Sequence, residues 1–337
     1  MSSERIFKKR PKERPAKALA RVTGLVLASI LAVSGLSGCK AAGGWGKDAE
    51  GKVKVMTTIY PMYDFAKRIG GEFVSVEMMV PAGTEPHAWE PSSKDMLKLE
   101  SADLFVYNGA GMELWVDDLI KGVQNKDLVV LEASENVELI RLDEDHEDED
   151  HDEHGHHHGE FDPHVWLSPL NAAIEMESIA AALSKIDPDH ASEYSKNLEE
   201  ARALCQELDN EMRDGLSGFE SKYLVVAHEA YGYLCQEYGL TQIGIEGVSA
   251  ESEPDAARMR EIIDLVNEYG ITCIFFEELV SPKVAETIAK ETGCETQSLS
   301  PLDGLSQEEM DAGSDYFSVQ KENLAAIIAA LEGENNG

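Results

Sequence analysis

Hydrophobic and polar positions in the first half of the chain alternate between the two periods that distinguish strands from helices. Short runs in which every second side chain is apolar predict strands, and the runs between them space apolar side chains as a helix does. Strands are expected at 53–59, 73–79, 104–107 and 128–131, and helices at 60–69, 92–100 and 113–121. This order of elements predicts an α/β lobe in which helices cover a parallel sheet.

The second half repeats the pattern after a long charged segment. Its strands are expected at 223–227, 242–245 and 272–276, with one more before the last helix, and its helices at 231–238, 255–269, 282–291 and 315–331. Residues 191–216 are rich in Glu, Leu and Ala and contain no proline and no glycine before Gly215, which predicts one helix about 40 Å long. This helix is either a rigid link between two lobes or a surface helix packed on one of them.

The N-terminal segment has the features of an export signal. Eight basic side chains within the first 21 residues precede an apolar run at 22–38 that is short and glycine-rich for a membrane span. The run ends in Leu-Ser-Gly-Cys39, which resembles a bacterial lipobox and predicts cleavage and lipidation at Cys39; the alternative is an ordinary signal peptide with a chance cysteine. The expected organisation is a signal peptide (1–38), a tether (39–52), an N-terminal lobe (53–187), a linking helix (188–218) and a C-terminal lobe (219–333).

The charge of the chain restricts its partners. The formal net charge is -35, and removal of the basic signal segment makes the remaining chain still more acidic. Such a surface repels nucleic acid and anionic membranes and raises the local concentration of cations. We therefore expect no nucleic-acid partner, and contact with a membrane only through the lipid anchor.

The remaining four cysteines are an even number in a chain predicted to be exported, where disulfides can form. Of the three possible pairings we favour Cys205 with Cys235 and Cys273 with Cys294, because each closes a short loop; buried thiols are the alternative. No CxxC pair is present, so cysteine is not expected to bind a metal.

An acidic, histidine-rich tract spans residues 143–160. No apolar residue lies between Leu142 and Phe161, so we expect a disordered loop whose imidazoles and carboxylates bind cations weakly and exchangeably; a solvated linker without a role is the alternative. Six of the ten histidines lie here: His146, His151, His154, His156, His157 and His158.

Three further histidines follow expected strands or lie in loops beyond them, where open α/β sheets bind ligands. His87 lies in Pro-Ala-Gly-Thr-Glu-Pro-His-Ala-Trp-Glu-Pro-Ser, His164 in Asp-Pro-His-Val-Trp-Leu-Ser-Pro, and His228 opens His-Glu-Ala-Tyr-Gly-Tyr. Each alone is equally compatible with a buried structural histidine. The tenth, His190, precedes the long helix and is expected at the surface.

Together with Tyr-Asn-Gly-Ala-Gly at 107–111, Ile-Glu-Gly-Val-Ser at 245–249 and Leu-Asp-Gly-Leu at 302–305, these segments resemble the metal-specific solute-binding proteins of bacterial zinc and manganese ABC importers. The resemblance covers nearly the whole chain after Cys39. It implies two βα lobes with parallel sheets joined by a long rigid helix, with the metal in the inter-lobe cleft. The family's ligands match His87, His164, His228 and Asp303, although a water could replace Asp303.

The resemblance implies an extracytoplasmic protein that captures Zn²⁺ as cargo and delivers it to an ABC permease with a cytoplasmic ATPase. Zinc is favoured because three imidazoles and a carboxylate suit tetrahedral zinc, whereas the manganese branch carries a carboxylate at the position of His228. We expect a monomer on the outer face of the cell membrane, without enzymatic activity, since the sequence contains no HExxH motif. A manganese-binding homologue and a surface adhesin or zinc buffer are the alternatives. Protonation of the histidines below about pH 6.5 is expected to weaken binding.

Overall fold

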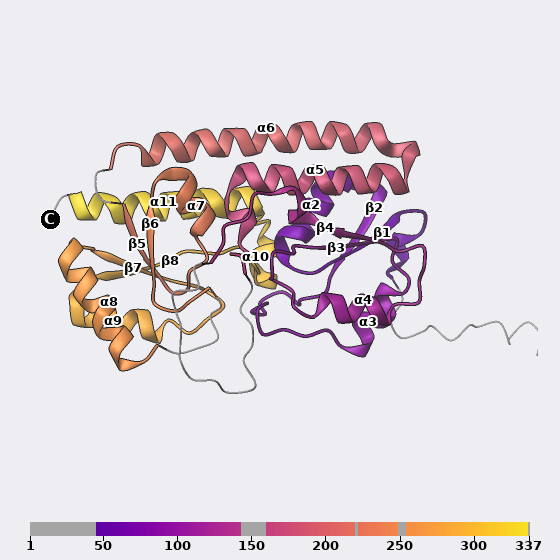
Figure 1. The fold of residues 1–337 in the computed structure, drawn as a ribbon. Helices are drawn as coiled ribbons and strands as arrows, with labels where there is room; N and C mark the ends of the chain where they lie inside the picture. The colour runs from indigo at the N-terminus through magenta and orange to yellow at the C-terminus, as the bar shows by residue number, and fades with distance from the viewer. Residues whose placement is uncertain (1–44, 143–159, 220–221, 249–253, 336–337) are drawn as a thin grey trace, which may run out of the picture. The chain divides into compact units, whose positions relative to one another are not determined.

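The computed structural model describes residues 45–142, 160–219, 222–248 and 254–335, and these belong to one compact unit (Figure 1). The expected signal peptide, Cys39 and the six histidines of the acidic tract lie outside the described residues. No helix in the described ranges has the length and apolar character that crossing a membrane requires.

The N-terminal lobe contains a four-stranded parallel sheet in the order β2-β1-β3-β4. Alternate side chains of the central strands enter two different clusters, so both faces of the sheet are buried. Helices α2 and α5 cover one face, and α3 and α4 cover the other (Figure 1). The bounds are β1 Val53–Thr57, α2 Tyr60–Gly70, β2 Val74–Met78, α3 Ser93–Leu99, β3 Leu104–Tyr107, α4 Val116–Gly122, β4 Val129–Glu132 and α5 Pro169–Ile186.

The C-terminal lobe repeats this topology in a second parallel sheet, with the order β6-β5-β7-β8. Helices α8 and α9 cover one face, and α7 and α11 the other. Its elements are β5 Tyr223–Val226, α7 Gly232–Tyr238, β6 Thr241–Gly244, α8 Ala256–Tyr269, β7 Cys273–Phe276, α9 Lys283–Thr292, β8 Glu295–Ser298, α10 Gln307–Ala312 and α11 Tyr316–Asn335. Short 3-10 turns lie at η2 Lys47–Ala49, η3 Gly71–Phe73, η4 Ala133–Asn136, η5 Val165–Leu167 and η6 Pro188–His190.

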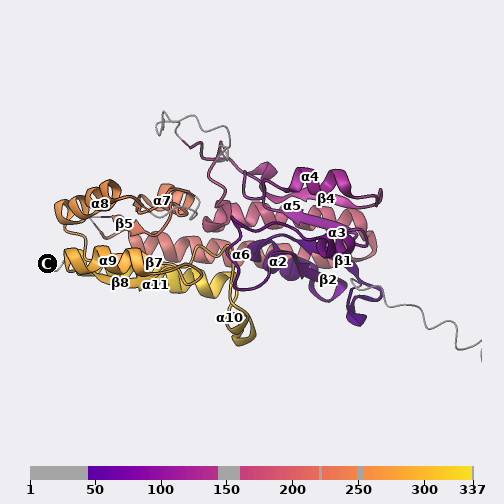
Figure 2. The same cartoon turned by 90° about the horizontal axis from the view of Figure 1, so that it is seen from below.

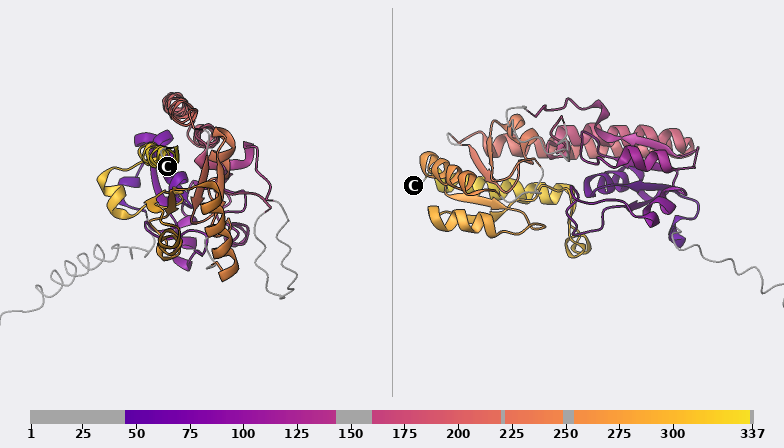
Figure 3. Two further views of the ribbon diagram at one scale, coloured as in Figure 1. Left: turned by 90° about the vertical axis from the view of Figure 1, so that its left-hand side faces the viewer. Right: turned by 60° about the horizontal axis from the view of Figure 1, so that its bottom comes forward.

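The long helix α6, Ala191–Leu216, has the predicted bounds. It forms a hairpin with α5, contacts α2 in the N-terminal lobe, and contacts α7 and α11 in the C-terminal lobe. Figures 2 and 3 show from other directions that α6 extends past elements of both lobes. One hydrophobic cluster continues beneath it from lobe to lobe, so α6 is a link between the lobes and not a helix of one lobe only.

Cys205 and Cys235, the first expected disulfide pair, are free thiols in the structure. Cys205 on α6 and Cys235 on α7 are buried within the large hydrophobic cluster, where each behaves as a small apolar side chain. Burial raises the pKa of both thiols to about 12, which makes them unreactive. The Sγ atom of Cys294 lies 3.1 Å from the carbonyl oxygen of Ile271, and the pairing of Cys273 with Cys294 stays a prediction.

Candidate metal centre

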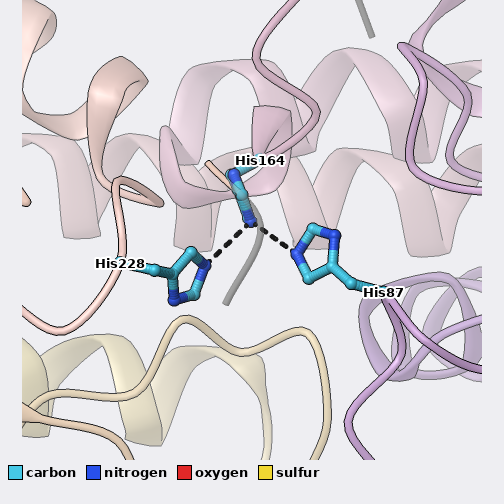
Figure 4. A group of neighbouring side chains, drawn as sticks. All are labelled: His87, His164 and His228. Atoms are coloured by element: carbon cyan, nitrogen blue, oxygen red, sulfur yellow. Dashed lines mark hydrogen bonds between the residues drawn. The ribbon is translucent and has the colours of Figure 1, made fainter. Parts of the chain in front are cut away.

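Three imidazoles from three separate segments meet between the lobes. His87 follows β2, His164 lies directly ahead of η5, and His228 follows β5. The Nε2 atom of His164 lies 3.3 Å from Nε2 of His87 and 3.3 Å from Nε2 of His228. Figure 4 shows the three rings turned toward a common point, and one ligand atom from each lies within 4.8 Å of the others.

Two carboxylates behind the rings fix the orientation of His164 and His228. Asp162 Oδ1 lies 2.9 Å from His164 Nδ1, and Glu277 Oε1 lies 2.5 Å from His228 Nδ1. In both histidines Nδ1–H therefore donates to a carboxylate, and Nε2 faces the centre. Such carboxylate–imidazole pairs set the tautomer and raise the basicity of a metal-binding histidine.

His87 is held through its backbone. Glu85 accepts hydrogen bonds from the backbone N–H groups of His87, at 3.1 Å, and Ala88, at 3.2 Å. Glu90, the other carboxylate near His87 in the sequence, is exposed. The loop between β2 and α3 is therefore organised by Glu85.

The three imidazoles differ in protonation. Burial and the neighbouring charge of His228 lower the pKa of His87 to about 3 and that of His164 well below its usual range. Burial alone would lower the pKa of His228, but Glu277, with smaller contributions from Asp303 and Glu85, raises it to about 9. At neutral pH the metal-free centre therefore carries its extra proton on His228.

Asp303 follows β8 and lies at the edge of the centre, beside His87. Its side chain is only 4% exposed, and burial together with the charge of Glu277 raises its pKa to about 7. One carboxylate oxygen lies within 4.8 Å of ligand atoms of His87 and Glu85, whereas Asp303 is not part of the three-histidine group. The preceding Leu302 has a φ of +59°, an unfavourable value for leucine that fixes the direction of this loop.

The structure thus brings together the three sequence-predicted histidines and places Asp303 beside them. Sequence reasoning missed Asp162 and Glu277, although each had a signal: Asp162 stands two residues ahead of His164, and Glu277 directly follows an expected strand. His190 lies elsewhere, stacked on Phe73 and hydrogen-bonded to Asp187.

The spacing of the nitrogens suits zinc. Nitrogens about 2.0–2.1 Å from a tetrahedral Zn²⁺ lie about 3.4 Å apart, close to the two Nε2 separations of 3.3 Å. Trp166 is fully buried against the His164 ring, with centroids 5.4 Å apart, and its indole N–H donates to the Pro301 carbonyl. The centre is therefore a dry, nitrogen-rich site with a carboxylate at its edge.

Comparison with known proteins agrees with this geometry. The family model described as zinc-uptake complex component A, periplasmic (ZnuA) matches residues 55–330. The chain belongs to the ZnuA family. The family resemblance inferred from the sequence is thus confirmed, as is the fold of two α/β lobes with parallel sheets.

Relatives within and around the ZnuA family extend the comparison. The zinc-binding protein AdcA of Streptococcus pyogenes is 43% identical over 289 residues, covering 83% of this chain and 56% of AdcA, so the chain spans about half the length of that relative. The high-affinity zinc uptake system protein ZnuA of Bacillus subtilis is 43% identical over 286 residues, covering 84% of this chain and 89% of that protein. The Zn(II)-bound ZnuA-like domain of Streptococcus pneumoniae AdcA superposes with a TM-score of 0.71 and 38% identity, covering 84% of this chain and all of that domain.

Proposed function

We propose that this protein is the metal-capturing component of a zinc importer. His87, His164 and His228 bind Zn²⁺ as cargo, and Asp303 supplies the fourth ligand. The observation that carries this proposal is the pair of 3.3 Å separations between Nε2 atoms of rings held from behind by Asp162 and Glu277. The ZnuA family match, to a zinc-uptake component, supports the same cargo.

Zinc is preferred to manganese at this site. Three imidazole nitrogens are good ligands for Zn²⁺, whereas Mn²⁺ favours carboxylate, carbonyl and water oxygens. The oxygen donors at the centre belong to Asp303 and Glu85, whereas two of the three nitrogen donors, His164 and His228, are 0% and 1% exposed. An ion that enters fully must therefore accept nitrogen ligands.

The protein acts as a carrier and not as an enzyme. Lipidated at Cys39, it remains on the outer face of the cell membrane as a monomer. It passes Zn²⁺ to a permease whose cytoplasmic ATPase drives import. The link formed by α6 and the hydrophobic cluster shared by both lobes favour release through a small displacement of the lobes.

The decisive experiment is competitive titration of the full-length protein with Zn²⁺ and Mn²⁺, with metal content measured after dialysis. We expect tight zinc binding that is lost in His228→Ala and kept in the surface control His190→Ala. Preference for manganese, or unchanged zinc affinity in His228→Ala, would refute the assignment. A strain lacking the protein should grow poorly in chelated medium and recover with added zinc.

A further inference from the structure

A second group of possible metal ligands adjoins the three imidazoles. Glu85, His87 and Asp303 each place one ligand atom within 4.8 Å of the other two, and His87 belongs to both groups. Within the described residues, the carboxylate of Asp303 makes no ion pair and no side-chain hydrogen bond, and the backbone N–H of Gly304 donates to it. A buried carboxylate is costly unless a positive charge compensates it. In the metal-free protein the protonated His228 supplies that charge, and a metal ion that displaces the proton can take its place.

Glu85 and Asp303 also line a small hollow of about 10 Å³, roughly the space of one water molecule. Glu277, Glu278 and Glu309 complete its acidic wall, and no lysine or arginine lines it. Glu278 is exposed and Glu309 partly exposed, whereas Glu277 and Asp303 are 5% and 4% exposed. The carboxylates around the hollow thus range from exposed to buried.

The surface on the other side of His87 is lined by other kinds of side chain. There a cleft of about 1050 Å³ is lined mainly by apolar side chains, including Trp89, Met96, Leu97 and Trp115. Among the described residues that line this cleft, only Glu90 and Asp118 are carboxylic acids. A hydrated Zn²⁺ ion needs new ligands for each water it loses, and apolar walls supply none. Among the described residues, carboxylate ligands for the ion are therefore concentrated on the Glu85 and Asp303 side of His87.

We propose that Glu85, His87 and Asp303 form a transit position through which Zn²⁺ enters and leaves the three-histidine site. This inference rests on the proposed zinc-binding function. An ion at the transit position has two carboxylates and one imidazole as ligands. Moving inward, it exchanges Glu85 for His164 and His228, while His87 and Asp303 stay bound. No step leaves the ion without protein ligands.

A transit position changes rates and not the final equilibrium. Removing the charge of Glu85 should slow entry and exit together, because both pass through the same position. We expect Glu85→Gln to lower the association and dissociation rate constants of Zn²⁺ each about ten-fold, with the dissociation constant changed less than about three-fold. The matched control is Glu90→Gln, which removes an exposed carboxylate on the apolar side of His87 and should leave both rates unchanged.

Stopped-flow mixing of the full-length protein with Zn²⁺ alone measures these rates. Fluorescence is followed in a variant that keeps only Trp166 of the four tryptophans. Because Trp166 is buried against the His164 ring, it reports arrival at the histidine site. An unchanged association rate in Glu85→Gln would overturn the proposal. So would weaker equilibrium binding at an unchanged association rate, because Glu85 would then act only by positioning the backbone of His87.

A second variant separates these outcomes from local misfolding. Glu278 is exposed and lines the outer part of the hollow. Its side-chain hydrogen bonds are with Ser298 and Glu309 and not with His87. Glu278→Gln should slow association about two-fold without changing the equilibrium affinity; full wild-type rates in both variants would reject the route. Failure of the wild-type protein to bind zinc, or full affinity in His228→Ala, would refute the proposed function instead.

Discussion

His228 Nδ1 lies 2.5 Å from Glu277 Oε1, and this contact controls the charge of the imidazole facing the metal position. The pKa of His228, which burial alone would lower, is raised to about 9 mainly by Glu277. In the metal-free protein at neutral pH the ring therefore carries both protons and donates Nε2–H to His164 Nε2, 3.3 Å away. Zinc must displace that proton.

We therefore predict proton-coupled zinc binding over a more alkaline window than the reference histidine pKa suggests. Because the metal-free pKa of His228 is about 9, affinity should fall as pH decreases below 9, roughly ten-fold per unit between pH 8 and 7. Calorimetry in buffers of different ionisation enthalpy should show about one proton released per Zn²⁺ at pH 7.5. Affinity that stays constant from pH 9 to 7 would contradict this.

Glu277→Gln tests the source of this shift. Glutamine can still accept the Nδ1–H of His228 but supplies no charge, so the pKa of His228 should fall and proton release at pH 7.5 should decrease toward zero. Well above pH 9, His228 is unprotonated in both the wild-type protein and Glu277→Gln. There we expect about ten-fold weaker zinc binding by the variant, because its imidazole is less basic. Glu278→Gln, which removes the exposed neighbouring carboxylate, is the control and should keep the wild-type pH profile.

The described residues on either side of the acidic tract are hydrogen-bonded to each other. Arg141 and Phe161 form an antiparallel bridge, Leu142 N–H donates to the Glu160 carbonyl at 3.1 Å, and Asp162 N–H donates to the Ile140 carbonyl at 2.9 Å. Replacing residues 143–159 with a short Gly-Ser turn should therefore leave Asp162 and the centre in place. Equilibrium dialysis should show one tight zinc ion per chain and the loss of weaker ones; loss of the tight ion would contradict the assignment.

The sequence predicted the sheets and α6 because their signals are local. Strand alternation is carried by neighbouring residues, and α6 has a polar outer face that makes its period visible. Helix α5 was missed because it is buried between the first sheet and α6. A helix covered on several sides lacks the single apolar stripe that reveals an amphipathic helix.

The candidate site likewise has residues that the sequence predicted and residues that it did not. The three histidines were found because they follow strands or occupy loops in recognisable segments. The role of Glu277 depends on packing between residues 49 positions apart, which neither period nor composition records. The grouping of Asp303 with Glu85 likewise depends on two loops from different lobes.

Cys205 and Cys235 offer a chemical check on the first expected disulfide. Because Cys205 and Cys235 are buried thiols with pKa values of about 12, we expect no alkylation by iodoacetamide in the folded protein at pH 8. Both should be alkylated after denaturation without reductant, as peptide mass spectrometry can show. A Cys205–Cys235 cross-linked peptide would restore the original expectation.

Glu175 on α5 is a buried acid without a partner. Its side chain is 0% exposed, and neither carboxylate oxygen has a hydrogen bond within the described structure. Burial, with a contribution from the charge of Glu113, raises its pKa well above the usual range. The folded protein therefore keeps a proton that the unfolded chain releases above about pH 4.3, so this group lowers stability as pH rises above that value.

We predict that Glu175→Gln stabilises the metal-free protein at pH 8 and has little effect at pH 4.5, where the acid is largely protonated when folded. The free energy of unfolding at pH 8 should increase by about 1–3 kcal/mol. The amide does not ionise, so folding no longer has to protonate a carboxylate, and the amide occupies nearly the same volume. Urea unfolding at both pH values measures it. Glu177→Gln, on the exposed side of α5 where Glu177 pairs with Arg202, is the control and should change stability by less than about 1 kcal/mol. An equal effect of Glu175→Gln at both pH values would mean that packing, and not the buried charge, determines the result.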